Sequence, residues 1–270
     1  MSGARETTGP DALAAMFARA RRESRAAFLP YFPIGYPTVA DSLDAIEALA
    51  RAGVDGFEIG MPFSDPLADG PTIQAATQIA LENGVTVGRC LDAVGELRAR
   101  GVTQPMLLMG YLNPLLAYGL ERFARDARAA GAAGVIVPDL PPEEAGPLAE
   151  ACAREGLAQI VFLAPTSSPE RIALVAKRAQ GFIYLVSVTG VTGARDSLPL
   201  DLQAFITRVR AATSTPLVLG FGISRPEQVQ QVSAWVDGFI VGSALVRAAA
   251  AGVEAVRDLA LTLRHALDEA

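Results

Sequence analysis

A glutamate lies inside an apolar segment early in the chain, and two aspartates follow it in a loop. Glu58 is flanked by Phe57 and Ile59, and Asp65 and Asp69 come after it. An ionised carboxylate without a partner is costly in apolar surroundings, and it takes up a proton instead. We therefore expect Glu58 to have a raised pKa and to serve as a general acid.

Each of these carboxylates also has a structural alternative. Glu58 could pair with a buried arginine, although no arginine lies beside it in the sequence. Asp69 precedes Gly70 and Pro71, an arrangement that also suits the N-cap of a helix. Asp65 has a comparable capping or turn-forming role open to it.

The order of the predicted elements indicates the fold class. Eight short apolar segments rich in β-branched and aromatic residues alternate with amphipathic segments typical of helices. Such units predict an α/β fold, a closed (β/α)8 barrel of the TIM type, rather than an open doubly wound sheet, because no Gly-x-Gly-x-x-Gly fingerprint follows the first strand. The predicted strands are 28–34, 56–61, 106–111, 134–138, 159–164, 182–188, 217–223 and 238–241.

An additional helix is predicted before the first strand. Leu13, Met16, Phe17 and Ala20 recur at helical spacing, and we expect them to pack on the N-terminal face of the barrel. No linker or charge block divides the chain. Residues 1–270 are therefore predicted to form a single barrel domain.

Composition restricts the partners and the compartment. The net charge is −6 and the basic residues are spread along the chain, which argues against a nucleic acid or an anionic membrane as partner. Residues 1–10 are polar, and no apolar run is long enough to span a bilayer. Cys90 and Cys152 are predicted to be free buried thiols. We expect a cytoplasmic enzyme that acts on a small molecule.

Polar residues at strand ends are the first candidates for chemistry, because barrel enzymes work at the carboxyl ends of their strands. Glu58, Asp69, Asn113 and Tyr184 lie at or after such ends. For Tyr184, a core tyrosine with a satisfied hydroxyl is the alternative.

Glycine-rich segments lie after the sixth and seventh strands, at 190–193 and 220–224, and along and after the eighth, at 238–243. Glycines let backbone N–H groups approach a phosphate closely, and a short helix starting at Ser243 would point its positive end at the anion. Glycine turns are common in themselves, but their place after strands seven and eight favours a phosphate ester as ligand.

Residue types that are missing narrow the reaction further. His265, the single histidine, and Lys177, the single lysine, both lie in predicted helices. A Schiff-base aldolase needs a desolvated lysine, and a zinc aldolase needs several metal ligands. We expect no metal and no cofactor in this chain. If a carbon–carbon bond is cleaved, the substrate must carry its own electron sink.

Three segments, 57–71, 190–193 and 220–224, closely resemble the tryptophan synthase alpha chain family, and the agreement extends over about 28–246. The resemblance implies retro-aldol cleavage of indole-3-glycerol phosphate to indole and glyceraldehyde 3-phosphate. It also implies a partner beta chain that carries pyridoxal phosphate, in an alpha2-beta2 tetramer.

The same resemblance implies roles for individual residues. Glu58 matches the acid/base that protonates indole C3, Asp69 matches the carboxylate that accepts the indole N–H, and Tyr184 matches the tyrosine beside them. Thr192 matches a residue that helps the loop after the sixth strand to close over Asp69. The other matches are Tyr31, Met109, Ile136 and Phe221 in the indole pocket, Gly193, Gly222, Gly242 and Ser243 at the phosphate, and Pro62, Asp65, Asn113 and Asp139 on the face toward the beta chain.

Three functional interpretations remain at this point. The first is the lyase; the second is another phosphate-binding barrel enzyme, such as a sugar-phosphate isomerase or epimerase; the third is a non-catalytic partner subunit. Turn formation and helix capping are the alternatives for the partner-face residues. We also expect the glycine-rich loop after the sixth strand to be mobile when empty and ordered by ligand.

Overall fold

The computed structural model of the chain describes residues 7–186, 201–220 and 222–268. In this part of the chain, eight parallel strands pair in sequence order and the last pairs with the first. The closed barrel confirms the predicted fold class and excludes the open sheet. The strands are β1 Ala27–Pro33, β2 Phe57–Gly60, β3 Met106–Met109, β4 Gly134–Ile136, β5 Ala158–Leu163, β6 Ile183–Val186, β7 Leu217–Gly220 and β8 Gly238–Val241.

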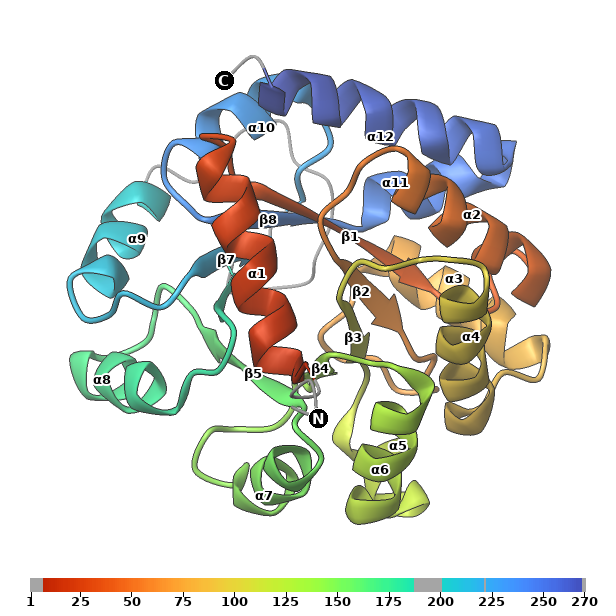
Figure 1. Cartoon of the computed structure of the whole chain (residues 1–270), viewed down its shortest axis with the longest axis horizontal. Coiled ribbons are helices and arrows are strands. Elements are labelled where there is room, and N and C mark those ends of the chain that lie inside the picture. Colours follow the sequence, from red (N-terminus) through yellow and green to blue (C-terminus); the bar gives the residue numbers. More distant parts are fainter. Residues whose placement is uncertain (1–6, 187–200, 221, 269–270) are drawn as a thin grey trace, which may run out of the picture.

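Helices surround this barrel (Figure 1). Several begin at the predicted signals: Ser168 caps α8 by accepting a hydrogen bond from the Arg171 N–H, and Pro226 is the first residue of α10. The described helices are α1 Gly9–Arg22, α2 Val39–Arg51, α3 Pro71–Glu82, α4 Val87–Ala99, α5 Leu112–Tyr118, α6 Leu120–Ala130, α7 Gly146–Arg154, α8 Pro169–Arg178, α9 Leu202–Arg210, α10 Pro226–Ser233, α11 Ser243–Ala248, the 3-10 helix η1 Ala249–Ala251 and α12 Val253–Asp268.

The extra helix α1 closes the N-terminal end of the barrel, as predicted (Figure 1). Leu13, Met16, Phe17 and Ala20 are all at most 4% exposed. Phe17 packs edge-on against Phe182 near the start of β6, with 5.9 Å between ring centroids. Burial of a large apolar side chain contributes about 1.5–3 kcal/mol, so these contacts hold α1 firmly in place. The carboxyl ends of the strands lie at the opposite end of the barrel.

The ends of β1, β2, β5 and β8 lie within one residue of the prediction, but β3, β4 and β7 end two or three residues early, and β3 and β4 do so for a local reason. β3 ends at Met109 because Tyr111 is already the N-cap of α5. β4 ends at Ile136, and Pro138 has no N–H with which to extend the ladder. β7 ends at Gly220. The residues that follow these earlier strand ends belong to the loops that contain candidate site residues.

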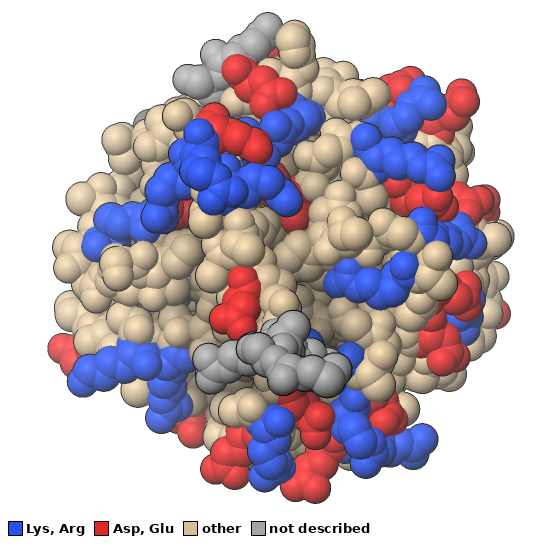
Figure 2. Space-filling view, viewed as in Figure 1, with Lys and Arg blue, Asp and Glu red and all other residues tan. Residues whose placement is uncertain are grey.

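An ion pair anchors the N-terminal end of the barrel. Asp55, which is 1% exposed, lies in the bend before β2 and accepts hydrogen bonds from the Arg25 guanidinium at 2.6 and 2.8 Å and from the Phe28 N–H at 2.9 Å. Burial alone would raise the pKa of Asp55, but the hydrogen bonds and charge of Arg25 outweigh it and lower that pKa. Figure 2, viewed from this end, shows side chains of both charges intermixed on the surface.

Both cysteines are free and buried, as predicted, with Cys90 in α4 and Cys152 in α7. Burial raises the pKa of each thiol to about 12, so both remain uncharged packing groups. Over the described ranges, none of the helices has the length and apolar character required to cross a membrane.

Candidate active site

Glu58 is buried in the barrel, and one of its carboxyl oxygens has no hydrogen-bond partner among the described residues. It is 1% exposed, and its register neighbours Tyr31 on β1 and Leu107 on β3 belong to the interior core. Among the described residues, none donates a hydrogen bond to Oε1, so the alternative of pairing with an arginine is not observed there. Burial, and then the negative charge of Asp69, raise the pKa of Glu58 to about 8. At neutral pH this carboxyl holds a proton, as its apolar context predicts.

Asp69 lies in the loop between β2 and α3 and is half-buried. The N-cap residue of α3 is Gly70, so Asp69 is not the helix cap. Its Oδ2 accepts a hydrogen bond from the Tyr111 hydroxyl at 2.9 Å. Burial raises the pKa of Asp69 to about 6, and the bond from Tyr111 acts against that rise. At neutral pH Asp69 is therefore mainly ionised and Glu58 mainly protonated.

Two tyrosines from other strands face the same carboxylates. Tyr184 on β6 is 7% exposed and Tyr31 on β1 is 8% exposed. The pKa of each phenol is raised well above its ordinary value by burial first and then by the charges of Glu58 and Asp69. The structure thus brings Tyr184 near both carboxylates.

Two glycines make room for these phenols. A Cβ on Gly60 would lie 2.4 Å from the Tyr31 hydroxyl oxygen, and a Cβ on Gly220 would lie 2.1 Å from Cε1 of Tyr184. Real side chains do not approach so closely, so only glycine allows the tyrosines to lie where they do. The sequence analysis included both glycines in motifs but did not find this role, because a sequence does not show which side chain a glycine faces.

Tyr111 is the site residue that the sequence analysis missed. It follows β3, is 5% exposed, and its ring packs against Phe63 with 5.4 Å between centroids. Besides its bond to Asp69, its hydroxyl accepts a hydrogen bond from the Ala68 N–H at 3.0 Å. The available signal was a phenol at the predicted end of a strand, the same signal that identified Tyr184.

Three of the residues predicted for the indole pocket, Tyr31, Met109 and Ile136, lie in the interior core of the barrel. Met109 and Ile136 are register partners on β3 and β4, and both pack in the interior core that includes Tyr31. Ile136 is fully buried and Met109 is partly exposed. Phe221 and Thr192, and with Thr192 the expected closure of its loop, lie outside the described residues.

Three of the four predicted phosphate-binding residues, Gly222, Gly242 and Ser243, lie after the ends of neighbouring strands. β7 and β8 pair with Gly220 opposite Ile240, so Gly222 and Gly242 follow adjacent strand ends. Gly242 is the N-cap of α11, which begins at Ser243 as predicted. Free N–H groups at a helix start attract an anion. Gly193 lies outside the described residues.

The residues assigned to the partner face lie on three consecutive segments after β2, β3 and β4. Asp139 has an observed capping role, because its carboxylate accepts hydrogen bonds from the Leu112 N–H at the start of α5, at 3.0 and 3.3 Å. Leu67 is 87% exposed and Leu116 is 52% exposed on the same segments. The four assigned residues are Pro62 and Asp65 in the β2–α3 loop, Asn113 in α5, and Asp139 after β4.

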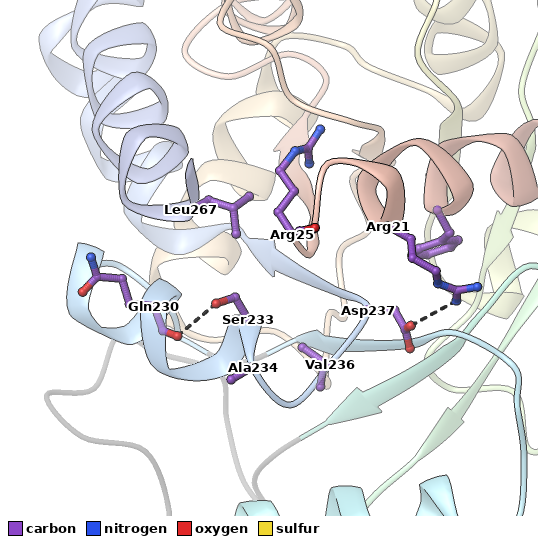
Figure 3. A pocket seen from close by; sticks show the side chains of 10 residues that line it. Arg21, Arg25, Gln230, Ser233, Ala234, Val236, Asp237 and Leu267 are labelled. Carbon is purple, nitrogen blue, oxygen red and sulfur yellow. Dashed lines mark hydrogen bonds and ion pairs between the residues drawn. The ribbon is translucent and has the colours of Figure 1, made fainter. Parts of the chain in front are cut away.

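A separate cavity of about 280 Å³ lies between α1, α10 and α12, away from the carboxyl ends of the strands (Figure 3). Its charged side chains form structural ion pairs, Arg21 with Asp237 at 3.5 Å and Arg25 with Asp55 at 2.6 Å. Across the described ranges, no three His, Cys, Asp or Glu side chains are grouped so that they could hold a metal ion.

Comparison with known proteins decides the family. A model described as the tryptophan synthase alpha chain matches residues 17–266. The chain belongs to this family. It is 54% identical over 230 residues to the tryptophan synthase alpha chain of Chloroflexus aggregans, a match that covers 85% of this chain and 86% of the relative.

Solved structures agree with this membership. The fold superposes on a tryptophan synthase structure from Mycobacterium tuberculosis with a TM-score of 0.90 at 40% identity, covering 95% of this chain and 98% of that one. A tryptophan synthase alpha chain from Legionella pneumophila gives a TM-score of 0.88 at 33% identity, with 96% and 97% covered. As a tryptophan synthase alpha chain, the protein is the lyase subunit that cleaves indole-3-glycerol phosphate to indole and glyceraldehyde 3-phosphate, and its partner is the beta chain. The predicted family, activity and partner are thereby confirmed.

Proposed function

We propose that the cleavage proceeds by carboxylate acid–base catalysis, with Glu58 as the acid and Asp69 as the acceptor of the indole N–H. The observation that carries this mechanism is the buried Oε1 of Glu58, which has no hydrogen-bond partner among the described residues and belongs to a carboxyl with a pKa of about 8. Such a group holds a proton ready to donate at neutral pH.

The electron flow follows from the chemistry of the ring. Glu58 donates its proton to indole C3, and the positive charge that develops on the ring nitrogen is stabilised by its hydrogen bond to ionised Asp69. The bond from C3 to the glycerol carbon then breaks, and its electrons return to the ring. The hydroxyl on that carbon gives its proton back to the Glu58 carboxylate and becomes the aldehyde.

The remaining residues orient the substrate. Met109, Ile136 and Tyr31 supply apolar surface for the indole ring, and Tyr184 lies beside both carboxylates. Gly222, Gly242 and Ser243, together with Gly193, would hold the phosphate through backbone N–H groups. Phe221 would complete the indole pocket, and Thr192 would help its loop to close over Asp69.

The wider assignment follows the family. Pyridoxal phosphate belongs to the beta chain, and the alpha-chain reaction itself uses no cofactor. The exposed segments that carry Pro62, Asp65, Asn113 and Asp139, with Leu67 beside them, would contact the beta chain in an alpha2-beta2 tetramer. The protein would work in the cytoplasm as one domain over residues 1–270.

An indole-release assay on the purified chain alone tests the proposal. The chain is given indole-3-glycerol phosphate and, in parallel, pentose phosphates as isomerase and epimerase substrates. Indole release with equal amounts of glyceraldehyde 3-phosphate is the expected result. Turnover of a sugar phosphate without indole would support the isomerase or epimerase instead, and absence of any turnover, with or without beta chain, would support a non-catalytic subunit.

A further inference from the structure

The hydroxyl of Tyr111 connects two consecutive residues of the β2–α3 loop. It donates a hydrogen bond to Asp69 Oδ2 at 2.9 Å and accepts one from the Ala68 N–H at 3.0 Å. A phenol has a single proton, and acceptance from Ala68 orients the hydroxyl so that this proton points at Asp69. The direction of the bond to the carboxylate is therefore fixed by the loop itself.

The phenol is anchored both to α5 and to the β2–α3 loop. Tyr111 is 5% exposed, its ring packs against Phe63, and it is the N-cap of α5. The next residue, Leu112, donates its N–H to Asp139. The backbone of Asp69 is held by its own loop, where its N–H bonds to the Pro66 carbonyl at 3.0 Å, and by α3, where its carbonyl accepts a hydrogen bond from the Gln74 side-chain amide at 2.9 Å. Tyr111 thus ties the Asp69 side chain to the end of β3.

We propose that Tyr111 is a positioning residue for the lyase reaction: its hydroxyl holds the Asp69 carboxylate in the orientation that receives the substrate's indole N–H. Tyr111 itself acts through Asp69 and takes no proton from the substrate. The inference rests on the proposed role of Asp69 as that acceptor. A neighbouring hydrogen bond that orients a catalytic group raises the reaction rate, because even a small misplacement of that group slows the reaction strongly.

The same bond favours the ionised form of Asp69. The described titratable groups that interact with Asp69 are Glu58 on β2, Tyr31 on β1, Tyr184 on β6 and Tyr111 after β3. These groups are acids and bring no positive charge. Burial raises the pKa of Asp69 to about 6, and the hydrogen bond from Tyr111 opposes that rise. Without the hydroxyl, the pKa of Asp69 would increase further.

The variant Tyr111→Phe tests this role while it keeps the ring that packs against Phe63. We expect kcat/KM for indole release to fall about tenfold at neutral pH, the size of effect expected for one hydrogen bond to a charged group. The acid limb of the pH profile should also move to higher pH, so that the loss becomes smaller as pH rises. Circular dichroism and thermal unfolding check that the variant is folded.

Tyr118→Phe is a matched control. Tyr118 lies at the end of the same helix α5, and its hydroxyl likewise donates to an aspartate, Asp126 Oδ2, at 2.9 Å. That bond joins α5 to α6 and involves no strand-end residue. The control should leave both kcat/KM and the pH profile unchanged.

A double variant distinguishes the positioning role of Tyr111 from the proposed role of Asp69 as acceptor. If Tyr111 acts through Asp69, then Tyr111→Phe added to Asp69→Asn should cost little further activity. An acid limb that stays in place in Tyr111→Phe, or a full additional loss in the double variant, would overturn the role of Tyr111 while Asp69 kept its own. If Asp69→Asn alone released indole at the normal rate, both the proposed acceptor and its positioning residue would be wrong.

Discussion

Asp69 acts on Glu58 through its charge: burial first and then the charge of Asp69 raise the pKa of Glu58 to about 8, whereas burial raises the pKa of Asp69 only to about 6. Two carboxyls in one site therefore hold one proton between them near neutral pH. The proton lies on Glu58, because Glu58 is 1% exposed and no described residue bonds to its Oε1, while Asp69 is half-buried and bonded to Tyr111. Because the two carboxyls are buried to different extents, Glu58 can act as the proton donor while Asp69 remains an ionised acceptor.

The first prediction is a bell-shaped pH dependence of kcat/KM. Activity requires Asp69 ionised and Glu58 protonated, so it should rise as pH increases through about 6 and fall as pH increases through about 8. The maximum should lie near pH 7. Steady-state indole release measured from pH 5 to pH 9 checks both limbs, in steps of about 0.5. A profile that kept rising above pH 8 would contradict a protonated Glu58 as the acid.

The second prediction concerns Glu58→Gln, which replaces the carboxyl by a neutral amide of similar shape. Indole release should fall by roughly 10²–10⁴-fold, the usual contribution of a general acid or base. The assay uses saturating substrate with the purified variant. Retention of a substantial part of the wild-type rate would remove Glu58 from the mechanism.

The stability of the same variant provides its control. A carboxyl whose pKa is raised in the folded state lowers the free energy of unfolding above its unfolded pKa, because the unfolded chain releases the proton and the folded chain keeps it. The amide does not carry this cost. Glu58→Gln should therefore be more stable than wild type at pH 7, on the order of 3 kcal/mol, and the difference should vanish as pH falls toward 4. An unfolded or destabilised variant would show that the loss of turnover has another cause.

The sequence could predict the barrel and the environment of Glu58 because both depend on local pattern. Alternation of apolar segments and helices specifies eight units, and the flanking Phe57 and Ile59 indicate that Glu58 is buried. The helical spacing of Leu13 and Met16 in the same way predicted the buried face of α1. In these cases the residues next to each position in the sequence determine whether that position is buried.

Contacts between loops could not be predicted in this way. Tyr111 meets Asp69 only because adjacent strands β2 and β3 bring their loops together, and its place at the predicted end of a strand did not identify that partner. Asp55 lies close to Glu58 in sequence, but it faces the other end of the barrel and pairs with Arg25. Such contacts depend on the closed barrel and its register, which local pattern does not specify.

The third prediction tests the contact between Gly220 and Tyr184. In Gly220→Ala the new Cβ would lie 2.1 Å from the tyrosine ring, so the phenol must move. We expect kcat/KM to fall at least about tenfold and the free energy of unfolding to fall by about 1–3 kcal/mol, the usual cost of overpacking.

Gly95→Ala in α4 is the matched control, because its Cβ would have no neighbour within 4 Å. That helix substitution should preserve activity and stabilise the chain by about 0.5–1 kcal/mol. Equal activities for the two variants would show that Tyr184 tolerates displacement.

The fourth prediction concerns Asp55, at the end of the barrel away from the site. Asp55→Ala leaves Arg25, whose side chain is 5% exposed, without its buried partner. Breaking a buried pair in this way should cost about 3–5 kcal/mol at pH 7, measured by urea unfolding. Activity per folded molecule should be unchanged.

Acid dependence distinguishes this pair from general packing. The pKa of Asp55 is lowered in the folded state, so its stabilisation is present above the unfolded pKa and is lost as pH falls through the lower, folded value. The difference between wild type and Asp55→Ala should therefore shrink below about pH 4. Glu121→Ala is the control, since it removes an exposed partner of Arg154 and should cost less than about 1 kcal/mol at any pH. A difference for Asp55→Ala that stayed constant with pH would mean that the charge of Asp55 does not stabilise the barrel.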